Sequence, residues 1–182
     1  MKKILLIIVA AGIAFTAKSQ SENYKAFKVD IGLGYAIPSS GGGGTKAGAT
    51  FTVEPHYRLA DDFAVGLRLE GAALGYETGT GGNSDVNISV LSSYCATGEY
   101  YLMDSGFRPF VGAGAGLFTQ ASINVGSGSN SVETPSSSKF GFFPEVGFET
   151  GHFRMSADYN ILGSNSGYLA FKIGFFLGGG KK

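Results

Sequence analysis

The chain has 182 residues, and its fourteen Lys and Arg residues are matched by fourteen Asp and Glu residues. This balance lacks the basic footprint that a nucleic-acid partner requires, and a single cysteine excludes an internal disulfide framework. Thirty glycines, fifteen phenylalanines and nine tyrosines favour many strands joined by tight turns over a helical bundle.

The first twenty residues have the pattern of a secretory signal peptide. Two lysines precede an apolar run, Ile4–Phe15, and the small residues Ala17 and Ser19 suit a cleavage site. The run has 12 residues, which is too few for a helix to span about 30 Å of hydrocarbon. We therefore expect a cleaved signal peptide at residues 1–19 and a single domain at residues 20–182.

Cleavage at this point also sets the charge and class of the mature protein. Three of the fourteen bases lie in the signal peptide, which leaves 11 bases against 14 acids. A lipoprotein would need a cysteine at the cut, whereas the cysteine of this chain is Cys95. No later apolar run is long enough for a spanning helix. We expect neither a lipid anchor nor a transmembrane helix.

Eight segments alternate apolar residues with polar or small ones. In the first, Phe27, Val29 and Ile31 share one parity, while Lys28 and Asp30 share the other. Successive side chains of a strand point to opposite faces, so each segment predicts a strand with one apolar and one polar face. The predicted strands are residues 26–37, 47–59, 63–76, 86–102, 109–119, 140–150, 153–161 and 168–177.

The connections between these strands alternate in length. Short ones lie at residues 60–62, 103–108 and 151–152, and longer ones rich in Gly, Ser and Asn lie at 38–46, 77–85, 120–139 and 162–167. Short periplasmic turns, long outer loops and an even number of strands of about 9–11 residues are typical of outer-membrane barrels. A soluble secreted sandwich, the alternative, has no reason to alternate its loops. The sequence predicts an all-β fold, an eight-stranded antiparallel up-and-down transmembrane β-barrel.

Aromatic residues occur near both ends of the predicted strands, as in the two interfacial girdles of a barrel. The band beside the short turns is predicted to comprise Tyr57, Phe63, Tyr100, Phe110, Phe148 and Phe153. The band beside the long loops is predicted to comprise Tyr35, Phe51, Tyr76, Phe118, Phe140 and Tyr168.

Two stretches resemble the small outer-membrane β-barrels of the OmpA/OmpX kind. Arg108–Phe118 is similar to the family's Arg-Pro-aromatic-Val-Gly-x-Gly-x-Gly strand, and Tyr168–Phe176 is similar to its aromatic-rich closing strand. The chain departs from the family by continuing through Leu177–Lys182. The resemblance implies an integral protein of the cell outer membrane, without enzymatic activity, that is inserted by the barrel-assembly machinery.

The charged residues that share the inward parity define the chemistry of the lumen. The predicted inward acids are Asp30, Glu54, Glu70, Glu99, Glu145, Glu149 and Asp158, and the predicted inward bases are Lys28, Arg58, Arg68, Arg154 and Lys172, with His56 titratable. An eight-stranded barrel is just wide enough for side chains to fill, and buried charges must pair. We therefore expect an ion-paired, largely closed lumen, with pairs such as Arg154 with Glu145 or Glu149.

Two glycine-rich stretches do not predict a nucleotide site. Gly112, Gly114 and Gly116 recur at period two, and no helix pattern follows to hold a phosphate. Gly41–Gly44 lacks a following Lys-Ser/Thr and is interpreted as a loop tip. The three strand glycines are instead expected to leave space in a crowded lumen.

Few residues suggest a catalytic or metal site. Glu149, His152 and Ser156 are the residue types of an acyl-hydrolysing site, but His152 falls in a turn, away from the geometry that a nucleophile and base need. His56 with its neighbours is interpreted as a member of a lumenal ion pair, since two histidines rarely form a metal centre. Cys95 is interpreted as a small residue packed in the lumen. We expect no catalytic, cofactor-binding or metal-binding residues and no cofactor.

Two classes of function remain. The first is a non-enzymatic outer-membrane protein, a monomer set in lipid, with a structural or surface-interaction role in which the long loops bind an extracellular ligand that the sequence does not name. The second is a barrel with an activity, either a narrow pore or a lipid A-modifying enzyme. Conductance and the mass of lipid A distinguish these classes.

Overall fold

The computed structural model describes residues 21, 23–39, 45–78, 85–104, 106–125, 131–132, 137–163 and 167–182. The predicted signal peptide lies outside this part, as do Gly41–Gly44 and parts of each long connection. The strands are β1 (Phe27–Pro38), β2 (Thr45–Arg58), β3 (Phe63–Thr78), β4 (Asp85–Tyr101), β5 (Phe107–Val125), β6 (Ser131–Val132), β7 (Ser137–Thr150), β8 (Phe153–Ile161) and β9 (Gly167–Gly178).

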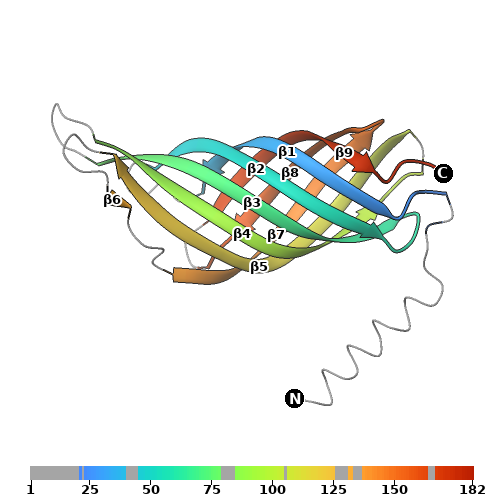
Figure 1. The fold of residues 1–182 in the computed structure, drawn as a ribbon, viewed down its shortest axis with the longest axis horizontal. Coiled ribbons are helices and arrows are strands. Elements are labelled where there is room, and N and C mark those ends of the chain that lie inside the picture. Colours follow the sequence, from blue (N-terminus) through green and yellow to red (C-terminus); the bar gives the residue numbers. More distant parts are fainter. Residues whose placement is uncertain are drawn as a thin grey trace, which may run out of the picture.

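Eight long strands close into one antiparallel barrel (Figure 1). Each pairs with its neighbours along the chain, the first strand β1 pairs with the last strand β9, and the β4–β5 pairing completes the circle. The two-residue strand β6 pairs only with the far end of β5 and forms no part of the wall. Within the described residues no α-helix is long and apolar enough to cross a bilayer. The predicted fold class is confirmed.

Most strand ends lie within two residues of their predicted positions, but β5 is longer than expected. It runs to Val125 where the sequence predicted an end at 119, because Gln120–Val125 continue the ladder with the long strand β4. The Gln120 amide also donates to the Ser89 hydroxyl at 3.0 Å. The polar composition of residues 120–125 indicated a loop. Pairing with the neighbouring strand β4 outweighed this preference.

The short connections lie together at one end of the barrel. They join β2 to β3, β4 to β5, and β7 to β8, and the C-terminus lies at the same end (Figure 1). The β7–β8 turn contains only Gly151 and His152, and Gly151 has φ of 60°, a left-handed conformation that glycine adopts without strain. This arrangement agrees with the predicted asymmetry between short and long connections.

The barrel turns its apolar side chains outward and its charges inward. Leu67 and Phe140, for example, are 60% and 71% exposed, whereas Arg68 and Glu149 are buried. This arrangement is the reverse of a soluble fold, in which the apolar side chains are buried. Every charged residue that alternation predicted to point inward is buried in the described strands. The soluble sandwich is excluded, because its apolar face would be hidden.

The predicted aromatic bands need a correction at three positions. Phe110, Phe118 and Tyr168 are buried in the lumen, with exposed fractions of 2% or less. Each lies on the inward parity of its strand, so nearness to a strand end was a poorer guide than alternation. The side chain of Tyr76 lies outside the described part, and members such as Tyr57, Phe63 and Tyr35 do face outward.

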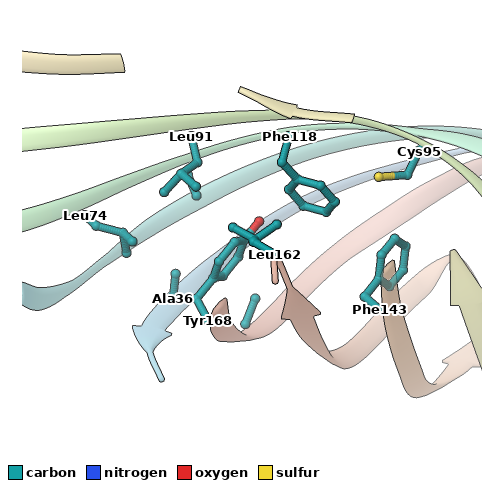
Figure 2. Packing of buried hydrophobic residues seen from close by; sticks show 10 residues of the cluster. Ala36, Leu74, Leu91, Cys95, Phe118, Phe143, Leu162 and Tyr168 are labelled. Atoms are coloured by element: carbon teal, nitrogen blue, oxygen red, sulfur yellow. The ribbon is translucent and has the colours of Figure 1, made fainter. Parts of the chain in front are cut away.

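An apolar cluster fills the lumen near the end opposite the short turns. Figure 2 shows Tyr168, Leu162 and Phe118 gathered there, with Phe143 and Cys95 to one side of them. The Arg68 guanidinium lies against the Phe143 ring, 3.4 Å from the ring centre. The buried thiol of Cys95 confirms its interpretation as a packed lumenal residue. Rings and charges thus share the space inside the barrel wall.

Candidate functional site

The middle of the lumen is organised around the guanidinium of Arg154 on β8. Its Nη1 lies 3.0 Å from Glu149 Oε1, and its Nη2 lies 3.3 Å from Glu145 Oε1 and pairs closely with Glu99 Oε1. The guanidinium also stacks 4.1 Å from the centre of the Phe110 ring. The predicted pairs with Glu145 and Glu149 are therefore confirmed, and Arg154 additionally reaches β4 across the barrel.

Lys28 on β1 forms a second centre in the same cluster. Its ammonium donates to the Tyr101 hydroxyl at 2.8 Å, lies 3.0 Å from Asp30 Oδ2, and pairs closely with Glu149. The Tyr101 hydroxyl donates in turn to Glu99 Oε2 at 2.7 Å. The buried Lys28 ammonium therefore joins three strands, β1, β4 and β7.

His56 on β2 lies among three carboxylates. Its Nε2 is 2.9 Å from Asp30 Oδ2 and 3.3 Å from Glu54 Oε1, and its Nδ1 is 3.7 Å from Glu99 Oε2. Its neighbour in register on β3 is Gly66, where an added Cβ would lie only 2.9 Å from Nδ1. The missing side chain at Gly66 lets the imidazole reach β4.

A separate ion cluster lies beside the apolar rings. Arg68 Nη1 lies 3.1 Å from Asp158 Oδ1, and Lys172 Nζ lies 3.0 Å from Glu70 Oε2 and 2.6 Å from Asp158 Oδ2. The Tyr168 hydroxyl donates to Glu70 Oε1 at 2.5 Å. Two acids therefore face two bases, and we call these four charged residues the upper cluster.

Stacked rings and guanidinium groups lie at the end with the short turns. Tyr24 is 4% exposed and lies against both Arg58 and Arg108, at 4.6 and 4.1 Å from its ring centre. Tyr101 lies against the same two guanidinium groups, at 4.9 and 4.1 Å. A cation facing an aromatic ring is attracted by the ring quadrupole. The arrangement forms a lid of alternating rings and cations.

The two ends of the described chain complete this lid. Tyr24 forms a β-bridge with Lys181, and the Lys182 ammonium donates to the Ser21 carbonyl at 2.7 Å. Ser21 and Asn23 both donate to the Asp61 carboxylate in the β2–β3 turn. These hydrogen bonds favour the ionised carboxylate and lower the pKa of Asp61 from its usual value.

Two arginines of the lid differ from what the sequence predicted: Arg58 has other partners than expected, and Arg108 was not predicted to point inward. Arg58 was expected in the ion network, but within the described residues it forms no salt bridge and stacks on Tyr24 and Tyr101 instead. Arg108 was assigned to a turn, whereas it is the second residue of β5 and points inward, donating to the Asp61 carbonyl at 2.8 Å. Its inward parity with Phe110 was the signal that could have placed it.

Glu149, His152 and Ser156, the residue types of an acyl-hydrolysing site, do not come together. Glu149 is held by Lys28 and Arg154, whereas His152 is exposed in its turn and its ring stacks 5.5 Å from that of Phe176. Ser156 is buried on β8. Within the described residues no contact joins these three side chains, so the arrangement lacks the hydrogen bond between base and nucleophile that acyl transfer uses.

The family model for the outer membrane protein beta-barrel domain matches residues 7–178. The chain belongs to this family. Its place is the cell outer membrane, with the outward apolar side chains set in lipid. No curated protein matches the sequence.

Solved structures agree on the fold at low sequence identity. Neisserial surface protein A has a TM-score of 0.59 at 20% identity, covering 86% of this chain and 99% of that one. OprG of Pseudomonas aeruginosa has a TM-score of 0.56 at 16% identity, covering 87% and 97%. Ail, the attachment invasion locus protein of Yersinia pestis, has a TM-score of 0.52 at 12% identity, covering 86% and 99%.

Proposed function

We propose that the protein is a non-enzymatic outer-membrane barrel whose closed lumen makes it a rigid anchor for its extracellular connections. The observation that carries this proposal is the ion-paired lumen itself. Arg154, Lys28 and Arg68 are all buried and each bridges carboxylates on more than one strand. Side chains held in this way support a lumen without a continuous water path, because an eight-stranded barrel is only just wide enough for its side chains to fill.

The closed lid at the short-turn end supports the same function. We call the charged residues around Arg154, Lys28 and His56 the middle cluster. Tyr24 and Tyr101 stack on two guanidinium groups at this mouth and narrow it, which would give a solute that passed the middle cluster a second barrier. With the barrel closed, the connections at the opposite end are the part left to act. We propose that they bind an extracellular ligand. Ail, of the same fold, is named for attachment.

The proposal includes the assembly of the protein. Removal of a signal peptide at residues 1–19 would leave the chain to the barrel-assembly machinery, which would read the closing strand β9. Phe175 and Leu177 of β9 face outward, as a strand presented to lipid requires. We propose a monomer, because a closed barrel has no free strand edge to pair with a second copy.

Conductance in planar bilayers tests the closed lumen. We expect little or no stable conductance from the refolded protein, and more frequent brief openings from Arg154→Ala, which removes the centre of the middle cluster. Lys139→Ala, which removes an exposed lysine, serves as the matched control and should behave like the unmodified protein. Large, steady single-channel steps from the unmodified protein would show a pore instead, and a changed lipid A mass on expression would show an enzyme.

A further inference from the structure

Three side chains of the middle cluster bring together the atoms that a divalent metal ion uses as ligands. Glu54, His56 and Glu99 each offer one ligand atom, and the three atoms lie within 4.8 Å of one another. One ion can bind only one ring nitrogen of His56: with Nε2 as that ligand, its separation from Glu54 Oε1 is 3.3 Å, and the separations that involve Glu99 lie within 4.8 Å. Ligands bound tetrahedrally to zinc at about 2.0–2.1 Å are separated by about 3.3–3.4 Å.

The hydrogen bonding of these atoms points to a missing partner. All three side chains are at least 98% buried, yet neither ring nitrogen of His56 nor Oε1 of Glu54 makes a hydrogen bond. Asp30 Oδ2 lies 2.9 Å from Nε2, but this contact does not have hydrogen-bond geometry. Buried polar atoms are normally satisfied, and one that is not indicates an absent ion or water.

The charge of the middle cluster points the same way. Its five carboxylates belong to Asp30, Glu54, Glu99, Glu145 and Glu149. They face two permanent cations, Lys28 and Arg154, so two negative charges remain in excess even when His56 is protonated. The upper cluster, by contrast, balances two acids with two bases. Among the described residues, the arginines of the lid form no ion pair with these five acids.

We propose that Glu54, His56 and Glu99 bind one divalent transition-metal ion of the zinc class. An imidazole with carboxylates suits this class, whereas magnesium and calcium prefer oxygen ligands alone. The ion joins β2 to β4 across Gly66 and offsets the surplus of negative charge.

The surrounding contacts orient the ligands as a metal site requires. Arg154 holds Oε1 of Glu99, which leaves Oε2 directed toward His56, and Tyr101 donates to that same Oε2. Carboxylates and histidines that bind metals are usually fixed by such outer contacts. From the sequence, His56 and its neighbours were expected to form an ion pair and no metal site. The sequence could not place Glu99 beside them, because it is on a different strand, 43 positions along the chain.

The test is the zinc content of the barrel refolded with Zn²⁺, without a histidine tag, and freed of unbound ion by gel filtration. We expect one Zn²⁺ per unmodified barrel, and at least a tenfold loss of affinity in His56→Gln and in Glu54→Gln. His152→Ala removes the other histidine, and Glu70→Gln makes the same chemical change in the upper cluster, so both should keep one Zn²⁺. Heat-modifiable migration shows that each variant is folded.

Two results would overturn the site. One is an unmodified barrel that holds no stoichiometric Zn²⁺, as expected if His56 is simply an imidazolium held by its carboxylates. The other is equal binding by the unmodified barrel and His56→Gln. If both ligand variants fail to fold, the unmodified barrel loaded with Co²⁺ decides the question, because a site with one imidazole and two carboxylates gives a tetrahedral visible spectrum and a surface-bound ion does not.

Discussion

At the scale of single residues, aromatic rings in the lumen occupy the space above glycines on the neighbouring strand. Phe110 lies opposite Gly147 in the β5–β7 register, and Phe143 lies opposite Gly114. A Cβ at Gly114 would lie 2.9 Å from the Ala96 carbonyl oxygen and 2.5 Å from a Phe143 ring carbon. Of the three glycines predicted to leave space in the lumen, Gly114 does so for a ring, whereas a Cβ at Gly116 would meet the backbone of Tyr94 and Cys95.

Gly114→Ala should destabilise the barrel by about 1–3 kcal/mol, because overpacking a filled interior displaces side chains or backbone. The matched control is Gly71→Ala, which has the same chemistry on a strand position where an added Cβ meets nothing within 4 Å. Urea unfolding of both variants in lipid vesicles measures the difference. Equal stability of the two would contradict the packing described here.

Arg154→Ala should cost about 3–5 kcal/mol of unfolding free energy, because it leaves Glu99, Glu145 and Glu149 buried without their shared guanidinium. The same urea titration measures it. Lys139→Ala removes a lysine that is exposed, and a surface substitution of this kind should change stability by no more than about 0.5 kcal/mol. A loss in Arg154→Ala no larger than in the control would show that the network does not stabilise the barrel.

Alternation predicted which residues point inward, and nearness to strand ends did not. Lys28, Glu54 and Asp158 are buried where their parity put them. Phe118 and Tyr168 were assigned to outer bands by position along the strand, although their own parity pointed inward. A two-residue period is enforced by backbone geometry, whereas an aromatic ring is as stable in a packed lumen as at a lipid interface.

At the scale of the strand, the outward side chains of β3 contact lipid. Leu67→Arg places a charge inside the apolar band and should cost about 2–4 kcal/mol near the bilayer midplane. Met103→Arg makes a similar change in the β4–β5 turn, where the side chain is exposed outside the strands, and should be tolerated. The yield of heat-modifiable barrel in the outer membrane compares them, and equal yields would mean that Leu67 does not face lipid.

The sequence predicted the strands but not which side chains meet across the lumen. Arg154 and Glu149 are direct partners in the β7–β8 register, so their pairing followed from chain order. The contact of Arg154 with Glu99 joins β8 to β4, which are separated by β7 and β5 around the barrel. Such contacts depend on the stagger of all the strands around the barrel. The cluster of Glu54, His56 and Glu99 was hidden for the same reason.

At the scale of the whole molecule, the two ends of the described chain meet where the barrel closes. β1 and β9 form the seam between the first and last strands, and the backbone amide of Lys25 donates to the Gly180 carbonyl at 2.9 Å beside it. The amide of Lys182 donates to the Asn23 carbonyl at 2.9 Å. We call these paired ends, residues 21, 23–25 and 179–182, the terminal clasp. Its one acidic anchor among the described residues is Asp61, in the β2–β3 turn.

The terminal clasp should open in acid. Its hydrogen bonds lower the pKa of Asp61 in the folded protein, so their stabilisation is fully present above the unfolded value of about 3.9 and is lost as pH falls through the folded value. The hydrogen-exchange protection factor of the Lys25 amide should therefore fall below about pH 4, while amides within β9 stay protected. Asp61→Asn should leave Lys25 weakly protected at every pH. Asp62→Asn, one residue along the same turn, should keep the same dependence of Lys25 protection on pH as the unmodified protein. A Lys25 protection factor that does not change with pH in the unmodified protein would mean that Asp61 does not anchor the clasp.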